Sequence, residues 1–211
     1  MNRNWRKGGK NAGTFIAAIF VILTSAGLTH GVTMEFGPEF NPANNHYYAI
    51  YSTGNPEIFI GWDSAKTAAE DQGGYLATLL TAEEDRFVLD AFAGAITLIG
   101  LRAWIGLTDV QEEGSFKWVT GPEGIQPLTY NHWLPGEPND AGGGEDYVEW
   151  RNEPGGYGTN QAWNDVPIDA WGISQFMVEF DTNPIPEPAT FFLLGFALIA
   201  VFGGYKKRFK R

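Results

Sequence analysis

The sequence predicts an α+β domain in which two helices precede a mostly antiparallel sheet. Two stretches of the first half, 62–72 and 81–94, carry small and apolar residues at helical spacing. The second half contains short apolar runs of strand length, separated by turn residues. With 211 residues, 44% of them hydrophobic, the chain can bury one substantial core and still carry additional terminal segments.

Each helix has a start signal, a stop signal or both. The first is expected at 62–72, where three alanines share one face and Gly73 ends the segment. The second is expected to begin at Thr81, which forms a capping box with Glu84, and to end at Gly94. Four apolar residues are expected to form its buried face: Phe87, Val88, Ala91 and Phe92.

The strands follow from alternation and from β-branched and aromatic content. They are expected at 46–51, 75–79, 103–107, 116–119, 147–150, 162–164 and 176–180. Four tryptophans within or beside these runs are expected in the core, because they carry the largest apolar side chains: Trp104, Trp118, Trp150 and Trp163.

A loop of more than twenty residues is expected between Gly121 and Glu145, and loops of that length are usually functional or disordered. Its end, Glu137–Asp146, packs four acids, an amide and three glycines into ten residues. Calcium binds six to eight oxygen ligands, which such flexible acidic loops supply. The alternative is a solvated acidic turn, since the same residue types favour turns.

A second polar pair, Asn164-Asp165, follows Trp163 at the end of an apolar run. Together with Glu137, Asn139 and Glu145, it gives five side chains that mix carboxylates and carboxamides. Both groups offer oxygen to Ca²⁺, the carboxylate accepts a hydrogen bond from a hydroxyl, and the amide nitrogen donates one. Two adjacent sugar hydroxyls could therefore complete the calcium shell.

These fragments resemble a C-type lectin carbohydrate-recognition domain over about residues 45–181. The matching segments are Trp104-Ile-Gly-Leu107, Glu137-Pro138-Asn139, Glu145 and Trp163-Asn164-Asp165. The resemblance implies a C-type lectin-like fold with a long calcium-binding loop and a cis bond between Glu137 and Pro138. It implies a principal Ca²⁺ site, in which all but Asp165 also bind the sugar: Glu137, Asn139, Glu145, Asn164 and Asp165. The Glu-Pro-Asn form implies mannose-type specificity.

The resemblance also implies an auxiliary Ca²⁺ site made of Asp109, Glu113, Asp140 and Asp146. The alternative for Asp109 and Glu113 is that they are ordinary exposed acids. Trp133 or Trp171 could instead stack on a sugar ring.

The chain has no cysteine, unlike most members of the resembled family. Where that family pairs cysteines, this chain has Ala69 with Val178, and Tyr147 with Ile168. Each absent disulfide removes about 2 to 4 kcal/mol of stability. We therefore expect the fold to depend strongly on Ca²⁺.

Charge is segregated along the chain, whose formal net charge is −11. Nine of the fourteen basic residues lie in the first ten or last six positions, whereas Val32–Ile185 holds five basic residues against 24 acidic ones. A domain with this excess of acids repels nucleic acid and anionic lipid and attracts cations. Nucleic acid is therefore not an expected partner.

Both ends indicate export. Residues 1–31 have the basic start, apolar run and small residues of a signal peptide, with a retained membrane anchor as the alternative, and residues 32–44 form a lead segment. Residues 182–188 form a linker that ends in Pro186-Glu187-Pro188. The following 189–205 segment could form a transmembrane helix of about 25 Å, and the basic 206–211 tail would stay cytoplasmic.

This C-terminal arrangement resembles the PEP-CTERM sorting signal, which implies processing by an exosortase-type membrane enzyme in bacteria that secrete polysaccharide. A plain C-terminal anchor is the alternative. The expected location is the membrane at first, through the C-terminal helix, and then the cell surface or the extracellular matrix.

The function expected from these patterns is Ca²⁺-dependent binding of a glycan or polysaccharide by a domain that is not an enzyme. A glycosidase pair formed by Glu137 and Glu145 is the catalytic alternative. Asn139 and Asn164 oppose it because carboxamides do not exchange protons, and His30, His46 and His132 show no triad pattern. A third hypothesis is a structural or protein-binding adhesin that keeps the fold and binds no sugar.

Overall fold

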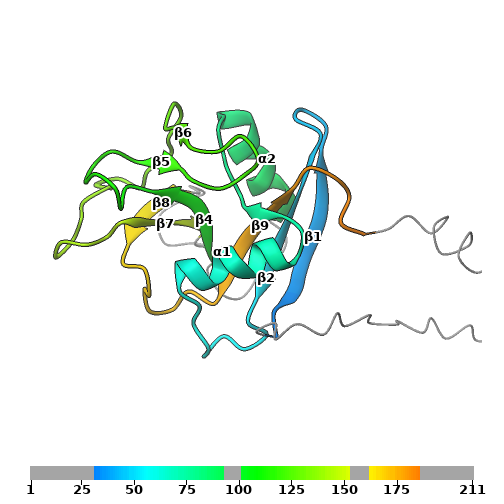
Figure 1. The fold of residues 1–211 in the computed structure, drawn as a ribbon, viewed down its shortest axis with the longest axis horizontal. Helices are drawn as coiled ribbons and strands as arrows, with labels where there is room; N and C mark the ends of the chain where they lie inside the picture. The colour runs from blue at the N-terminus through cyan, green and yellow to red at the C-terminus, as the bar shows by residue number, and fades with distance from the viewer. Residues whose placement is uncertain (1–30, 93–100, 153–161, 186–211) are drawn as a thin grey trace, which may run out of the picture.

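The computed structural model describes residues 31–92, 101–152 and 162–185. Two helices, α1 (Trp62–Asp71) and α2 (Ala82–Phe92), accompany one sheet (Figure 1). The strands are β1 (Thr33–Asn41), β2 (His46–Ser52), β3 (Tyr75–Leu76), β4 (Leu101–Thr108), β5 (Lys117–Trp118), β6 (Gln126–Pro127), β7 (Tyr147–Asn152), β8 (Ala162–Val166) and β9 (Gln175–Phe180). The expected α+β class is confirmed.

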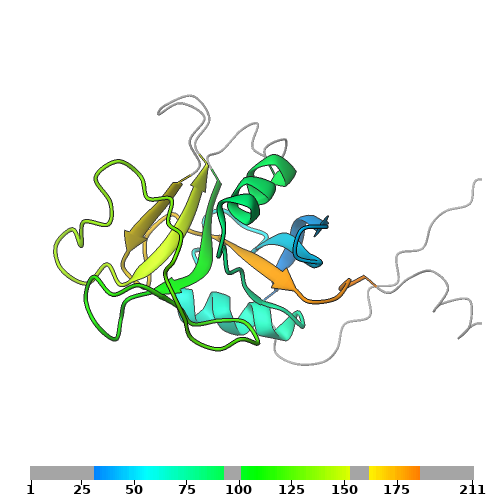
Figure 2. The same cartoon turned by 90° about the horizontal axis from the view of Figure 1, so that it is seen from above.

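The sheet is built around β4 and β9. Its main path runs β1-β2-β9-β4-β5-β6, with β3 paired to β9, β7 paired to β4, and β8 paired to β7. The strand pairs are antiparallel except β4 with β9, which run parallel. The described chain ends at one end of the molecule, and the long loop before β7 lies at the other (Figures 1 and 2).

Two hydrophobic clusters cover the two faces of the central strands, because neighbouring residues of a strand point to opposite sides. In β9, Met177 belongs to the first cluster and Val178 to the second. The first cluster packs under α2 through Val88 and the second under α1 through Ala65. The four tryptophans expected in the core are fully buried, so that expectation is confirmed: Trp104, Trp118, Trp150 and Trp163.

Both helices form close to where the sequence predicts them. At the start of α2, Thr81 Oγ1 accepts a hydrogen bond from Glu84 N (3.2 Å), and Glu84 Oε2 accepts one from Thr81 N (3.0 Å). This is the expected capping box, which satisfies backbone donors that the first turn leaves unpaired. Val88 and Phe92 are buried on its inner face. The expected stop at Gly94 lies outside the described residues.

The lead segment 32–44 contains a strand, β1, that its sequence pattern does not predict. β1 pairs antiparallel with β2, with register shifts between Met34 and Phe36 and between Phe36 and Glu39. Bulges of this kind and an internal proline are features of edge strands, and they hide the alternation that predicts a strand. β3 is shorter than the expected 75–79, and β6 interrupts the long loop.

Positions that replace the family's cysteines differ in their surroundings. Ala69 and Val178 lie in the same buried cluster, where apolar packing takes the place of a covalent link. Tyr147 packs its ring against Trp62, with centroids 5.1 Å apart, whereas Ile168 is 38% exposed.

The described residues include no helix that is long and apolar enough to cross a bilayer, and the expected signal peptide and the expected span at 189–205 lie outside them.

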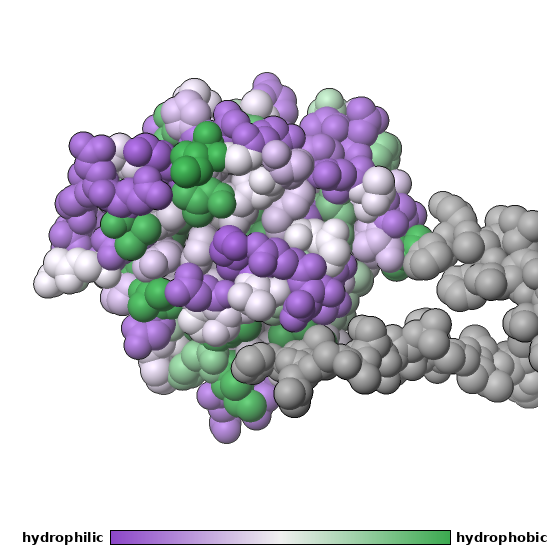
Figure 3. Space-filling model, in the orientation of Figure 1, coloured by the Kyte–Doolittle hydropathy of each residue, from purple (hydrophilic) through white to green (hydrophobic). Residues whose placement is uncertain are grey.

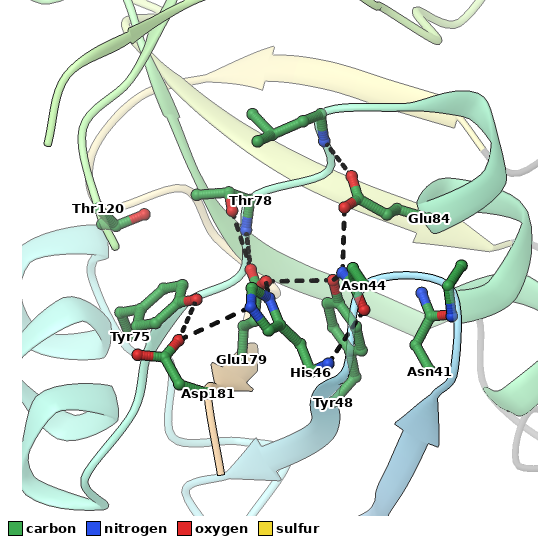
Figure 4. Close-up of polar contacts among 12 residues, drawn as sticks. Asn41, Asn44, His46, Tyr48, Tyr75, Thr78, Glu84, Thr120, Glu179 and Asp181 are labelled. Atoms are coloured by element: carbon green, nitrogen blue, oxygen red, sulfur yellow. Dashed lines mark hydrogen bonds and ion pairs between the residues drawn. The ribbon is translucent and has the colours of Figure 1, made fainter. Parts of the chain in front are cut away.

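A buried polar network joins β2, β9 and the start of α2 (Figure 4). Glu179, which is 1% exposed, accepts hydrogen bonds from Thr78 N (2.8 Å), Thr78 Oγ1 (2.9 Å) and Tyr48 O–H (3.1 Å). His46 Nδ1 lies 2.5 Å from Oε1 of the same carboxylate. Buried acids are tolerated only with such partners. His46 therefore has a structural role.

Gly106 in the Trp104–Leu107 segment is required by close packing. A Cβ at this position would lie 1.8 Å from Thr120 Oγ1 and 2.9 Å from the carbonyl oxygen of Leu76. We therefore expect Gly106→Ala to lower the free energy of unfolding by about 1 to 3 kcal/mol, the usual cost of overpacking. Denaturant unfolding measures this change. A free energy of unfolding equal to that of the wild type would show that the structure accommodates this Cβ without strain.

Candidate functional site

The long loop before β7 is tied to β8 by backbone hydrogen bonds. Trp163 N donates to the carbonyl of His132 (2.7 Å), and Leu134 N donates to the carbonyl of Trp163 (2.9 Å). These bonds place the loop beside Asn164 and Asp165, although about 25 residues separate the two segments. In Figure 3, hydrophilic residues gather at the end of the molecule that carries this loop.

Asp165 fixes the 137–145 part of the long loop through hydrogen bonds to its backbone. Its carboxylate is 1% exposed and accepts hydrogen bonds from Asn139 N (3.0 Å to Oδ2) and Asp140 N (2.8 Å). Asp165 lies in β8, while its donors follow the Glu137–Pro138 bond, which is cis as the resemblance implies. The structure thus brings these two predicted ligand segments together at one place.

Asp140 shapes the turn that leads to Glu145. Its Oδ1 accepts hydrogen bonds from Gly144 N (2.5 Å) and Glu145 N (3.1 Å), and Glu145 Oε2 accepts one from Ala141 N (2.7 Å). Gly142, Gly143 and Gly144 all have positive φ, which glycine adopts without steric cost. The glycine run therefore lets the loop fold back on its own acids.

The acids of the principal set affect one another. Burial, and then the charge of Asp165, raise the pKa of Glu137; Glu145 adds to this rise, and Arg151 opposes it. Burial followed by the charges of Asp165, Asp140 and Glu149 raises the pKa of Glu145. Glu137 Oε2 is buried and accepts no hydrogen bond. Since Asp165 is also a carboxylate, it could bond to Glu137 only if one of the two were protonated.

The acids of the auxiliary set that follow β4, Asp109 and Glu113, also have raised pKa values, and one of them has a buried oxygen without a partner. Asp109 is 2% exposed; its Oδ2 accepts a hydrogen bond from Gly114 N (2.7 Å), whereas its buried Oδ1 has no partner. Burial and the charges of Asp146 and Asp165 raise the pKa of Asp109. Partial desolvation and the charges of Asp109, Asp140 and Asp146 raise the pKa of Glu113. The two predicted sets are therefore electrostatic neighbours.

These residues suit calcium in chemical type. The set offers only oxygen donors, carries an excess of negative charge, and leaves Glu137 Oε2 and Asp109 Oδ1 buried without hydrogen-bond partners. Within the described parts of the chain, however, no three acidic or histidine side chains are grouped closely enough to hold a metal ion. The acids lie around one loop, but their spacing in this structure is not that of a complete coordination shell.

Glu149 and Arg102 contribute to the site and were not predicted. Glu149 is fully buried in β7, forms a two-bond ion pair with Arg102, and accepts a hydrogen bond from Asn164 Nδ2 (3.2 Å). An acid inside the apolar run 147–150 is the only local signal of this role. Its partners are set by strand pairing, which a single sequence does not reveal.

Asp85 in α2 supports the stem of the same loop. This carboxylate, 1% exposed, accepts hydrogen bonds from Tyr130 O–H (3.0 Å) and from the indole N–H groups of Trp150 and Trp163 (both 3.3 Å). His132 Nδ1 lies 2.5 Å from its Oδ2. The hydrogen bond and charge of Asp85 raise the pKa of His132 despite partial burial. The four contacts fix the loop stem on the core.

The two tryptophans considered for sugar stacking differ in exposure. Trp133 is partly buried, and its ring packs against Phe116 (centroids 4.8 Å apart) and Trp163 (5.8 Å). Trp171 is 80% exposed, with its ring edge-on to Phe59 at 5.3 Å. Trp133 is therefore largely occupied by core packing, whereas the face of Trp171 is accessible.

Without Ca²⁺, the free energy of unfolding is expected to fall as the pH rises from about 4.5 to 6. The folded-state pKa values of Glu137 and Glu145 lie above the ordinary 4.5, so the native state holds these protons more tightly than the unfolded state does. The stabilisation is present below pH 4.5 and disappears as the pH passes the raised values. His46 and His132, whose pKa values are raised above 6.5, stay protonated in this window.

Thermal unfolding in chelator across this pH range measures the slope. The double variant Glu137→Gln, Glu145→Gln should flatten it, because it removes two of the titrating groups. A wild-type midpoint that rises between about pH 4.5 and 6 would be the opposite of the expected sign.

Two family models match this chain, and several known proteins are similar to it. The family model of the Lectin C-type domain matches residues 60–169, and that of the PEP-CTERM protein-sorting motif matches residues 184–208. Halomucin of Haloquadratum walsbyi is 31% identical over 162 residues, and lactose-binding lectin l-2 of Anguilla japonica is 35% identical over 108. Among solved structures, the EPNH mutant of CEL-I from Cucumaria echinata is similar, with 25% identity and a TM-score of 0.50.

These matches cover different shares of the proteins concerned. The halomucin match takes in 66% of this chain and 2% of halomucin, and the lectin l-2 match takes in 51% of this chain and 60% of that lectin. The structural match to CEL-I covers 70% of this chain and 97% of the other. The shared unit is thus the domain that carries the long loop.

Proposed function

This chain belongs to the C-type lectin domain family, and on that premise we propose that it is an exported module that binds carbohydrate through Ca²⁺. The proposed ligands of the principal ion are Glu137, Asn139, Glu145, Asn164 and Asp165. The proposed ligands of an auxiliary ion are Asp109, Glu113, Asp140 and Asp146. The observation that carries the proposal is the convergence of the 137–145 loop on β8, with Asp165 bonded to the backbone of Asn139 and Asp140.

Electrostatics support a cation at this place. Carboxylates around the loop raise one another's pKa values, and two of their buried oxygens have no hydrogen-bond partner. Bound Ca²⁺ would supply a positive charge that offsets this repulsion. It would also offer free coordination positions to sugar hydroxyls. The turn at 142–144 consists of glycines with positive φ, so this part of the loop can adjust to an ion with little steric cost.

Family membership confirms the expectation that the domain binds a ligand and is not an enzyme. The neighbours of Glu137 agree with this role. Asn139 and Asn164 are carboxamides, which accept and donate hydrogen bonds at neutral pH without exchanging protons. The residues around Glu137 are therefore suited to ligation of metal and hydroxyl groups rather than to acid–base chemistry.

Mannose-type specificity is the finer part of the proposal. It rests on the Glu137-Pro138-Asn139 triplet, whose two polar side chains flank the cis bond. One shallow contact to two hydroxyls gains little beyond the cost of ordering the ligand, so we expect weak binding by a single domain. Several copies on one surface would supply useful avidity.

The match to the PEP-CTERM motif supports export and processing at a membrane by an exosortase-type enzyme. We propose that the chain consists of a signal peptide 1–31, a lead 32–44, a lectin-like domain 45–181, a linker 182–188 with the sorting motif Pro186-Glu187-Pro188, a membrane segment 189–205 and a basic tail 206–211. The described chain ends opposite the long loop, so a C-terminal attachment would leave the proposed site facing outward (Figure 1).

Calorimetric titration of the full-length protein with methyl mannoside and with methyl galactoside, each with Ca²⁺ and with chelator, tests the function. We expect mannoside heat that disappears with chelator and in Glu137→Gln. Thermal unfolding of that variant at saturating Ca²⁺ checks that it is folded. Ca²⁺ binding without any response to either sugar would count against sugar binding and favour a protein-binding adhesin.

A further inference from the structure

Glu149 lies in the middle of β7 with its charged side chain fully buried. Arg102 Nε donates to its Oε2 at 2.6 Å, and Arg102 Nη2 donates to its Oε1 at 3.0 Å. Arg151 Nε lies 3.7 Å from the same Oε1. Burial of an unpaired carboxylate is costly, and this pairing with two arginines offsets that cost and fixes Glu149 in place.

The third partner of Glu149 is Asn164, whose Nδ2 donates to Oε1 at 3.2 Å. The two residues are direct neighbours across the antiparallel pair of β7 and β8, so the sheet register sets their contact. A carboxylate without a proton only accepts hydrogen bonds, whereas a carboxamide donates through nitrogen alone. The amide of Asn164 must therefore present its nitrogen to Glu149, because the flipped orientation would place two acceptors together.

The pair borders the acids of the proposed site. The charge of Glu149 contributes to the raised pKa of Glu145. The charge of Arg151 acts in the opposite direction on the pKa of Glu137 and lowers it. Arg102 extends the arrangement, since its Nη1 donates to the carbonyl of Trp171 at 2.9 Å in the loop after β8. Glu149 is thus held from two sides and is not free to follow a moving Asn164.

We propose that Glu149 is a positioning residue that fixes the carboxamide of Asn164 with its oxygen turned away from β7 and available to a divalent cation. The inference rests on the proposed function, because it assigns a role to a residue behind one proposed ligand. Groups that orient a metal ligand typically change metal affinity by about 10- to 100-fold when they are replaced. The family resemblance did not include this residue, and its role follows from the contacts described above.

The proposal is tested by exchanging the hydrogen-bond acceptor at Glu149 and the donor at Asn164. The measured quantity is the Ca²⁺ affinity of the full-length protein. Glu149→Gln is expected to lower Ca²⁺ affinity by about 10- to 100-fold, because one acceptor for Asn164 is lost. Asn164→Asp places two carboxylates against each other. In that background, Glu149→Gln should raise Ca²⁺ affinity, because the carboxamide introduced on β7 can donate to the carboxylate introduced on β8 and the repulsion is removed. This sign reversal is a coupling that independent effects do not produce.

A second measurement needs no metal. In metal-free wild-type protein, the side-chain amide protons of Asn164 should exchange slowly with water in ¹H–¹⁵N spectra, because one of them is held by a buried carboxylate. Glu149→Gln should accelerate this exchange. Glu179→Gln is the matched control, since Glu179 is a similarly buried carboxylate on β9 whose partners include none of the proposed Ca²⁺ ligands. It should destabilise the fold and leave the Asn164 signals and Ca²⁺ affinity unchanged.

The outcomes separate the two claims. If the wild type binds Ca²⁺ but Glu149→Gln acts with the same sign in both backgrounds, the positioning role is overturned and the proposed function stands. If the wild type binds no Ca²⁺, the proposed function is overturned, and the role of Glu149 toward a cation is overturned with it. Reversal of sign together with faster exchange of the Asn164 amide supports both.

Discussion

Replacement of Asp165 by asparagine is expected to abolish measurable Ca²⁺ binding and to loosen the long loop. The carboxylate of Asp165 accepts backbone hydrogen bonds from both Asn139 and Asp140 while it is almost fully buried. Asn139 N lies 3.0 Å from Oδ2 and 3.2 Å from Oδ1, and an amide accepts through one of these atoms only, so its NH₂ group would face a backbone N–H in either orientation. Hydrogen bonds to charged groups contribute about 1.5 to 3 kcal/mol each.

We therefore expect Asp165→Asn to lower the free energy of unfolding by about 2 to 4 kcal/mol. Ca²⁺ affinity should fall at least about a hundredfold, because a charged ligand and the anchor of the loop are lost together. Denaturant unfolding and Ca²⁺ titration measure the two effects. Asp169→Asn, which removes the same charge from an exposed position, is the control and should change stability by less than about 0.5 kcal/mol. Equal Ca²⁺ affinity and equal stability of the two variants would contradict the role of Asp165 as calcium ligand and loop anchor.

The second large effect concerns removal of the ion from the wild type. At neutral pH, chelation is expected to lower the thermal unfolding midpoint by about 5 to 10 °C. A ligand present at about a hundred times its Kd stabilises a fold by about 2.7 kcal/mol, and one kcal/mol corresponds to about 2 to 4 °C at this size. The chain has no disulfide to limit the loss, since it contains no cysteine.

Scanning calorimetry in excess Ca²⁺, in chelator and in Mg²⁺ measures this dependence. Mg²⁺ requires a smaller, octahedral shell and should restore little of the midpoint. A midpoint that is the same in all three conditions would show that apolar packing, such as that between Ala69 and Val178, suffices for stability.

Much of the fold could be predicted because its signals are local. The capping box of Thr81 and Glu84, the alanine face of α1 and the buried tryptophans depend on residues a few positions apart, which periodicity detects. β1 escaped prediction because its bulges break the alternation, and β6 because two residues carry no pattern. These elements are specified by their neighbours in the sheet.

The candidate site divides in the same way. Residues that carry the resemblance, such as Glu137 and Asp165, lie in short segments whose order in the chain is informative. Glu149 and Asp85 act through partners from other elements, at sequence separations of 15 to 78 residues. An acid within a strand or helix gives no sign of which donor it will meet. Supporting residues of this kind become visible only when the strand register is known.

Direct titration of the full-length protein with Ca²⁺ by isothermal calorimetry is the measurement closest to the central claim. We predict saturable binding with a Kd of about 0.1 to 1 mM, the range of extracellular calcium modules. The signal should disappear in Asp165→Asn and remain in Asp169→Asn. Absence of saturable heat from folded wild-type protein at millimolar Ca²⁺, or binding that Asp165→Asn leaves intact, would contradict the account.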